Sequence, residues 1–277
     1  MPPGLSWTGC ERGAIRQTGD PREVPLRDHW RSVNRFLHIV ATALITAGLV
    51  VALDVGITLA WGEPLSGLYA KFQQGQAQDE LDELERAFPA AADLEAADNA
   101  RDLKERVGIL ADRFAASPGV AAGKGIGQIE IPAIHLDSTF VEGTDTASLQ
   151  RGPGHFSASP DEEVRRQGDG SAFPGQGKTV GIAGHRTTYA APFNRLDDLE
   201  PGDEITLTMP YATFVYEVQE IEIVDPNDID VVRNVGYERL VLSACHPLYS
   251  AAQRIITFAK LEEAGLFGSG TRIWQDP

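Results

Sequence analysis

Residues 239–261 decide the fold of this chain, and they read R-L-V-L-S-A-C-H-P-L-Y-S-A-A-Q-R-I-I-T-F-A-K-L. Two mostly apolar runs, at residues 239–245 and 254–261, flank a short segment that contains Pro247. Short apolar runs bounded by turn residues are typical of buried β-strands. We therefore interpret the stretch as a strand, a loop and a return strand of one sheet.

The sequence before this pair of strands also has the pattern of a β-protein. Apolar and polar residues alternate in four further segments, which are residues 126–132, 134–141, 204–209 and 214–224. The run T-V-G-I-A-G at residues 179–184 is short and mostly apolar, as a buried strand is. We expect helical turns only near Ala147 and residues 193–199. About eight short strands in some 150 residues predict an all-β domain in the form of a closed or nearly closed barrel.

An apolar segment, residues 36–61, precedes the β-region. Residues 39–61 carry one charge, Asp54, and about 20 apolar residues are enough to span a bilayer as a helix. The terminal Trp61 suits an interfacial position. A buried core helix and a signal peptide are the alternatives, but the apolar run is long for a signal peptide and no clear cleavage site follows it. We therefore predict one transmembrane helix over residues 36–61.

The charges on either side of this segment predict its orientation. Residues 1–35 contain six arginines, whereas residues 62–76 contain one basic residue, Lys71. Since positive charge stays in the cytoplasm, we expect a cytoplasmic N-terminal tail and an extracytoplasmic remainder. The two cysteines of the chain, Cys10 and Cys245, would then lie on opposite sides of the membrane. They could not form a disulfide within one chain.

Between the membrane helix and the barrel, residues 62–124 predict a helical stalk and a linker. Apolar residues recur at helical spacing in two stretches that Pro89 separates. The glycine-rich residues 117–127 indicate a linker into the barrel domain, residues 125–277. The stalk is either a spacer or lid for the barrel, or a solvated helix that packs loosely on itself.

Cys245 would be the only cysteine of the exported part, so its role needs an explanation. A buried structural cysteine is the simplest interpretation, because cysteine is among the most buried residue types. A zinc site needs three or four ligands, and the adjacent His246 would point to the opposite face of a strand. The remaining interpretation is a nucleophile, since an unpaired thiol in an oxidising compartment suggests a reactive group.

A nucleophilic thiol needs a base nearby and a group that stabilises a developing oxyanion. His185 directly follows the apolar run that ends at Gly184, and it is a better candidate for the base than His246. Arg254 opens the return strand and presents a planar fork of charged donors. The predicted catalytic group is therefore Cys245, His185 and Arg254. Candidate substrate contacts surround the cysteine and are Ser243, Ala244 and His246.

Further motifs occur along residues 125–275. They are I-E-I-P-A-I, V-E-G-T-D, G-P-G-H-F, P-G-Q-G-K-T, I-A-G-H-R-T-T-Y, A-P-F-N-R-L and A-C-H-P-L-Y-S-A-A-Q-R. In this order they resemble the sortases, and most closely the class E sortases of actinobacteria. The resemblance implies a sortase-type eight-stranded β-barrel with a His–Cys–Arg site. By motif, these three roles fall on His185, Cys245 and Arg254.

The resemblance also implies transpeptidation. The thiolate of Cys245 would attack the Thr–Gly carbonyl of a C-terminal sorting signal on a surface protein, with an L-A-x-T-G signal in class E. His185 would act as general acid and base, Arg254 would bind the oxyanion, and an amine of a peptidoglycan precursor would resolve the thioester. Sortases usually carry T-L-x-T-C where this chain has V-L-S-A-C. Val241 and Ala244 replace the two threonines, which leaves substrate specificity open.

Two other functions would use the same domain. One is a surface cysteine protease that uses water as the acceptor, and the other is an inactive barrel that only binds wall peptides or partner proteins. No residue pattern indicates a cofactor or a metal. The formal net charge of −16 argues against nucleic acid as a partner, because there is no basic surface to release counterions from phosphates.

Overall fold

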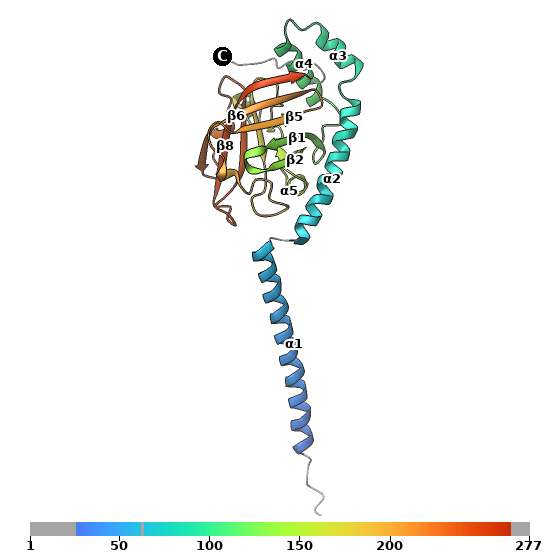
Figure 1. Ribbon diagram of the computed structural model, residues 1–277, viewed down its shortest axis with the longest axis vertical. Coiled ribbons are helices and arrows are strands. Elements are labelled where there is room, and N and C mark those ends of the chain that lie inside the picture. The colour runs from blue at the N-terminus through green and yellow to red at the C-terminus, as the bar shows by residue number, and fades with distance from the viewer. Residues whose placement is uncertain (1–25, 62–63, 267–277) are drawn as a thin grey trace, which may run out of the picture. The chain divides into compact units, whose positions relative to one another are not determined.

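A computed structural model of the chain describes residues 26–61 and 64–266 (Figure 1). By its internal contacts the chain divides into two compact units, Met1–Gly62 and Glu63–Pro277. The helices are α1 (Leu26–Trp61), α2 (Pro64–Ala87), α3 (Ala91–Asp98), α4 (Leu103–Ala115), α5 (Thr146–Leu149) and α6 (Glu162–Gln167), with 3₁₀ turns η1 (Pro132–Ile134), η2 (Leu196–Asp198) and η3 (Asp230–Val232). The strands are β1 (Gly125–Ile131), β2 (Leu136–Glu142), β3 (Gly154–His155), β4 (Thr179–Ala183), β5 (Glu204–Thr208), β6 (Ala212–Val224), β7 (Arg239–His246) and β8 (Gln253–Leu266).

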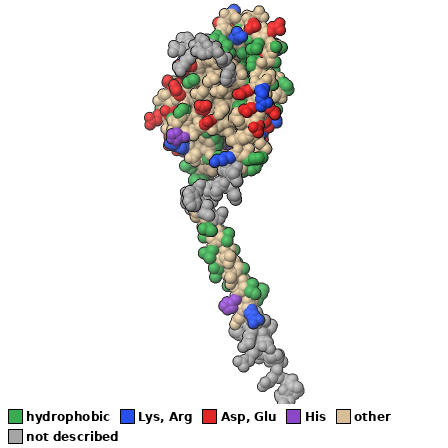
Figure 2. Space-filling view, turned by 45° about the vertical axis from the view of Figure 1, so that its right-hand side comes forward, with side chains coloured by type: hydrophobic (Ala, Val, Ile, Leu, Met, Phe, Trp, Pro, Cys, Tyr) green, Lys and Arg blue, Asp and Glu red, His purple; other side chains and the backbone are tan. Residues whose placement is uncertain are grey.

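The first unit contains one long helix, α1. Its segment Val33–Leu53 is long and apolar enough to cross a membrane by length and composition, and hydrophobic side chains are exposed along it (Figure 2). The helix begins at Leu26, so the last ten residues of the expected tail 1–35 are helical. Cys10 and the rest of that tail lie outside the described residues.

The eight strands form one closed barrel in the order β1-β2-β3-β4-β7-β8-β6-β5. Closure removes the unpaired edges that an open sheet would expose. The predicted all-β fold with an eight-stranded barrel and short helices is confirmed. His135, which we placed in an alternating strand, instead lies in the turn before β2 with a φ of 56°.

The predicted catalytic residues lie at the ends of three neighbouring strands, β4, β7 and β8. β4 and β7 run parallel, with Ala183 opposite Ser243. β7 and β8 are antiparallel, with Cys245 opposite Arg254. A parallel pair needs a long crossover between its strands, and here the crossover contains β5 and β6. The carboxyl ends of β4 and β7 consequently meet at one rim of the barrel.

The two faces of these strands pack against different clusters. Leu242 and Ala244 of β7 belong to the main core inside the barrel. Val241, on the other face, packs with Ile256 and Phe258 of β8 in a second, smaller cluster outside the barrel. Since successive side chains on a strand alternate between faces, the odd-numbered residues of β7 point outward. The outer cluster includes Val232 of η3, which places the β6–β7 connection over this face.

Helices α2 and α4 pack against the barrel and share its main core. Figure 1 shows α2 running alongside β1 and β2, and its residues contact both strands. Leu84 of α2 and Leu110 and Phe114 of α4 belong to the main core. The ring of Phe114 lies 5.5 Å from that of Phe173 and 5.3 Å from that of Tyr211. The helical region expected over residues 62–124 is present, and the apolar stripes of α2 and α4 are buried against the barrel.

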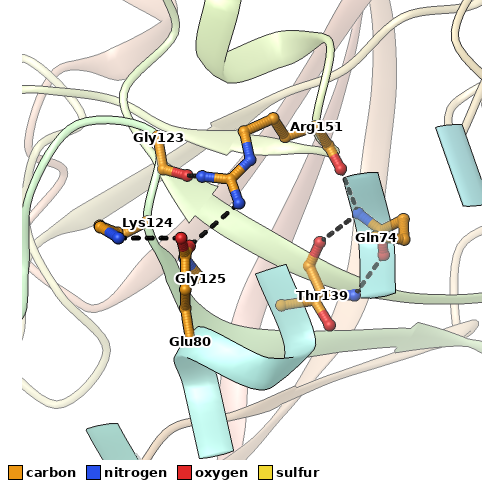
Figure 3. Close-up of polar contacts among 7 residues, drawn as sticks. All are labelled: Gln74, Glu80, Gly123, Lys124, Gly125, Thr139 and Arg151. Atoms are coloured by element: carbon orange, nitrogen blue, oxygen red, sulfur yellow. Dashed lines mark hydrogen bonds and ion pairs between the residues drawn. The ribbon is translucent and has the colours of Figure 1, made fainter. Parts of the chain in front are cut away.

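Polar side chains of α2 fasten it to strand β2 and its surroundings (Figure 3). The amide of Gln74 donates to the carbonyl of Thr139 at 2.9 Å and accepts from its backbone N–H at 3.0 Å, as a neighbouring strand would. Glu80 forms ion pairs with Lys124 at 2.9 Å and Arg151 at 3.1 Å. Satisfying backbone groups in this way protects a strand edge that β3, only two residues long, does not cover.

The buried position of Phe114 gives a test of this packing. We expect Phe114→Ala to lower the free energy of unfolding by about 3–5 kcal/mol, because it removes a fully buried aromatic ring and leaves a cavity. Chemical denaturation of the full chain in detergent measures this. Leu94→Ala on α3 is the matched control, since Leu94 is 40% exposed and should change stability by at most about 0.5 kcal/mol. Equal effects of the two substitutions would contradict the integrated core.

Candidate active site

Cys245 lies near the end of β7 on the outer face of the barrel. Its thiol is free and half-buried. Arg254 of β8 is directly opposite in the antiparallel register, and Cβ atoms of such pairs lie about 4.5–5.5 Å apart. Nη1 of Arg254 donates to the carbonyls of Ala251 at 3.1 Å and Gln253 at 2.9 Å. The register therefore places the side chains of Cys245 and Arg254 on the same face of the sheet.

His185 lies two residues beyond the end of β4. The N–H of Gly184 donates to the carbonyl of Ser243 at 3.0 Å, which continues the pairing of β4 with β7. The N–H of Phe193 donates to the carbonyl of His185 at 3.0 Å. Gly184 has no room for a side chain, since a Cβ there would lie 2.5 Å from the ring of Phe193. The backbone of His185 is thus held at the same rim as Cys245, and the strand alternation gives it the same outward parity as Ala183.

A short loop packs over the imidazole of His185. The ring of Tyr189 lies 5.1 Å from it, centroid to centroid, at an angle of 42°. Tyr189, Ala190 and Ala191 have φ values of 52°, 62° and 46°. Such left-handed conformations are strained in residues other than glycine and persist only where the surroundings impose them. The strain is concentrated directly beside the candidate base.

The imidazole of His185 has an unusual electrostatic environment. Burial lowers its pKa below the ordinary value of 6.5, because it disfavours the charged form. Among the described residues, Nε2 of His185 is buried without a hydrogen-bond partner. Buried polar atoms are nearly always paired, so an unpaired one calls for an explanation such as a catalytic role. The lowered pKa favours the neutral form of the ring, which is the form that a general base needs.

Comparison with known proteins agrees with this geometry. Residues 129–262 match the family model described as the sortase domain. This part of the chain is similar to a sortase domain. The predicted resemblance to the sortases is thereby confirmed, and the matched segment runs from β1 into β8.

Two relatives and one solved structure illustrate the similarity. Sortase D of Bacillus subtilis is 32% identical over 142 residues, which cover 50% of this chain and 64% of the relative. Sortase SrtE1 of Streptomyces coelicolor is 29% identical over 160 residues, 53% of this chain and 43% of the relative. The structure of the sortase D5 transpeptidase of Clostridium perfringens has a TM-score of 0.50 at 24% identity and covers 68% of this chain and 98% of that one. The last of these comparisons shows the fold alone.

The three candidate substrate contacts of the sortase domain do not share one face. Ser243 has the same parity as Cys245 and is half-buried. Ala244 is 3% exposed and belongs to the interior core. His246 also lies on the inner side, where its Nδ1 is 3.0 Å from Nη1 of Arg186. Ala244 and His246 point away from the thiol, because neighbours of Cys245 on the strand lie on its other face. Their contact with a substrate stays a prediction.

Sequence reasoning missed the charged group behind the site. Arg186 is 2% exposed and forms an ion pair with Asp197 at 2.6 Å. Burial raises the pKa of Asp197, but the hydrogen bond and charge of Arg186 outweigh this, so that the pKa lies below its usual value. The alternation of β4, in which Val180 and Ile182 face the core, was the available signal that Arg186 faces inward.

The remaining polar candidates of the domain have structural partners. His155 is buried, with Nδ1 2.7 Å from Glu142 and Nε2 3.0 Å from the carbonyl of Ala172. These contacts make His155 a structural residue. In the described part of the chain, no cluster of three or more histidine, cysteine, aspartate or glutamate side chains is arranged to hold a metal ion.

The lowered pKa of His185 can be measured directly. In the full chain, the imidazole resonance that disappears in the His185→Asn variant should titrate with a midpoint below 6.5 in NMR spectra. Because the folded chain binds this proton more weakly than the unfolded chain, acidification below pH about 6.5 should also destabilise the fold through this group. A midpoint at or above 6.5 would contradict the burial of the ring.

Proposed function

We propose that this protein is a membrane-anchored cysteine transpeptidase of the sortase type. The observation that carries the proposal is the strand register, which brings the ends of β4 and β7 and the start of β8 to one rim. Cys245, His185 and Arg254 come from these three neighbouring elements. A thiol, an imidazole and a fixed cation on one face are the parts that acyl transfer through a thioester requires.

In the proposed first step, His185 accepts the proton of the Cys245 thiol. The thiolate attacks the carbonyl carbon of the Thr–Gly bond in a sorting signal, and the carbonyl oxygen becomes an oxyanion. Arg254 stabilises this charge through its guanidinium donors. The intermediate collapses as the C–N bond breaks, and the imidazolium of His185 gives its proton to the leaving glycine amine. A thioester between the threonine and Cys245 remains.

The second step reverses the roles of the same groups. An incoming amine attacks the thioester carbonyl, and the now neutral His185 removes a proton from the amine. The C–S bond breaks, a new amide forms, and the thiol of Cys245 is regenerated. The lowered pKa of His185 suits this cycle, because a general base must be largely unprotonated at the operating pH.

The finer assignments rest on the resemblance to class E sortases. The donor would be a surface protein with an L-A-x-T-G or related signal, and the acceptor an amine of a peptidoglycan precursor. The helix α1 would anchor the enzyme as a single-pass membrane protein with its N-terminus inside. The arginine-rich residues 1–35 support this orientation, and the catalytic domain would then act outside the cytoplasm.

A peptide assay tests the proposal. The full chain in detergent micelles is incubated with a labelled L-A-x-T-G peptide, with and without a glycine-based or diaminopimelate-like amine, and products are identified by mass spectrometry. We expect a product that joins the threonine to the amine, and its loss in Cys245→Ala. Hydrolysis that the amine does not change would indicate a protease. No reaction with this peptide or an L-P-x-T-G peptide would contradict the proposal and favour an inactive barrel.

A second assay separates the two histidines that lie close to Cys245 in the fold or the sequence. His185→Asn should lower kcat/KM by about 10²- to 10⁴-fold, the range expected for loss of a general acid and base. His246→Asn should cost far less, because an amide oxygen can still accept the hydrogen bond from Arg186. If His246 proved essential and His185 dispensable, the assignment of faces on β7 would be wrong.

A further inference from the structure

A buried guanidinium group lies directly behind the rim that carries the proposed catalytic residues. Arg186 follows His185 in the chain and is 2% exposed. By volume it is the largest fully buried side chain among the described residues. Burying a charge is costly unless it is paired and hydrogen-bonded. An apolar side chain would fill the same space at a lower cost, so the position of this charge needs an explanation.

The contacts of Arg186 join its own segment to two others at the rim, which are residues 194–197 and the end of β7. Its guanidinium pairs with the carboxylate of Asp197 at 2.6 Å, and its Nε donates to the carbonyl of Asn194 at 3.4 Å. Its Nη1 donates to Nδ1 of His246 at 3.0 Å and, through a longer contact of 3.5 Å, to the carbonyl of Cys245. In return, the side-chain amide of Asn194 donates to the carbonyl of Arg186 at 2.8 Å.

The contact with His246 also fixes the state of that ring. A guanidinium can only donate hydrogen bonds, so Nδ1 of His246 must accept and therefore carries no proton. A ring oriented by this bond holds the end of β7 directly after Cys245. This guanidinium belongs to Arg186, the residue after His185. One planar group therefore connects the backbone next to His185 with the end of β7.

We propose that Arg186 is a positioning residue that holds the strand end bearing Cys245 at a fixed distance from the backbone of His185. It acts on the inner side of the rim, through the main chain and His246, while the thiol and the imidazole face outward. The activity test of this inference rests on the proposed transpeptidase function. The geometric part does not, because the reactivity of the Cys245 thiol can be measured without a sorting signal.

The main experiment compares Arg186→Met with Arg195→Met in the full chain. Arg195 belongs to the same connection and pairs with Asp198 at 2.7 Å, but it is exposed. Displacing reacting groups by about 1 Å can cost roughly 10²-fold in rate. We expect Arg186→Met to lower kcat by about that factor with KM for the peptide within twofold of the parent, and Arg195→Met to behave like the parent. A kcat within twofold of the parent in folded Arg186→Met would overturn the inference.

Two further variants keep the test decisive if Arg186→Met fails to fold. Arg186→Lys retains the charge but replaces the planar fork of five donors by one compact ammonium group, so kcat should remain well below that of the parent. Full activity of this variant would show that charge alone matters and would overturn the positioning role. Asp197→Asn removes the charge of a half-exposed partner and should lower kcat by a smaller factor. Parent-like kcat in both variants would also refute the inference.

A thiol-alkylation profile separates this inference from the proposed function. The rate at which iodoacetamide modifies Cys245 is measured against pH, below the unfolding temperature of each variant, with Cys10→Ser as the common background. We expect the midpoint of the profile to shift in Arg186→Met and to remain unchanged in Arg195→Met, whether or not any peptide is a substrate. An unchanged midpoint in a folded Arg186→Met variant would reduce Arg186 to a contributor to stability.

Discussion

The parallel pairing of β4 with β7 is the constraint on which the site depends. It places the carboxyl ends of two strands side by side although strands β5 and β6 lie between them in sequence. The antiparallel return of β8 then brings Arg254 opposite Cys245. A slip of one residue in either register would turn a functional side chain to the opposite face. The chemistry therefore depends on backbone hydrogen bonds before it depends on any side chain.

The outer and inner faces of this rim carry different kinds of side chain. The outer face carries the half-buried thiol, the imidazole of His185 and the strained loop around Tyr189. The inner face carries a charged group, Arg186 with Asp197 and His246, where a barrel would normally hold apolar side chains. The outer face has left-handed residues other than glycine, and the inner face has a buried charge, so both depart from ordinary packing at the same place. Such violations are expected where function, rather than stability, has determined the residues.

The sequence predicted much of this arrangement, and the reasons for its successes and failures are physical. Alternation and short apolar runs led to the barrel, and parity along β7 correctly separated His246 from the face of Cys245. The same parity, applied to Ala244, would have placed it inside the core. The packing of the helices was left open, because a helical stripe shows that a helix buries one face but not what it packs against. Phe114 meets Phe173 and Tyr211, which are distant in sequence.

The central claim is that Cys245 forms a thioester with the substrate, and the mass of the intact protein tests it most directly. The full chain is mixed with an L-A-x-T-G peptide in the absence of an amine, and the reaction is stopped with acid. The account predicts an added mass equal to the peptide fragment that ends at threonine, located on Cys245 and removed by hydroxylamine. Peptide cleavage without an adduct, or an adduct on any other residue, would contradict it.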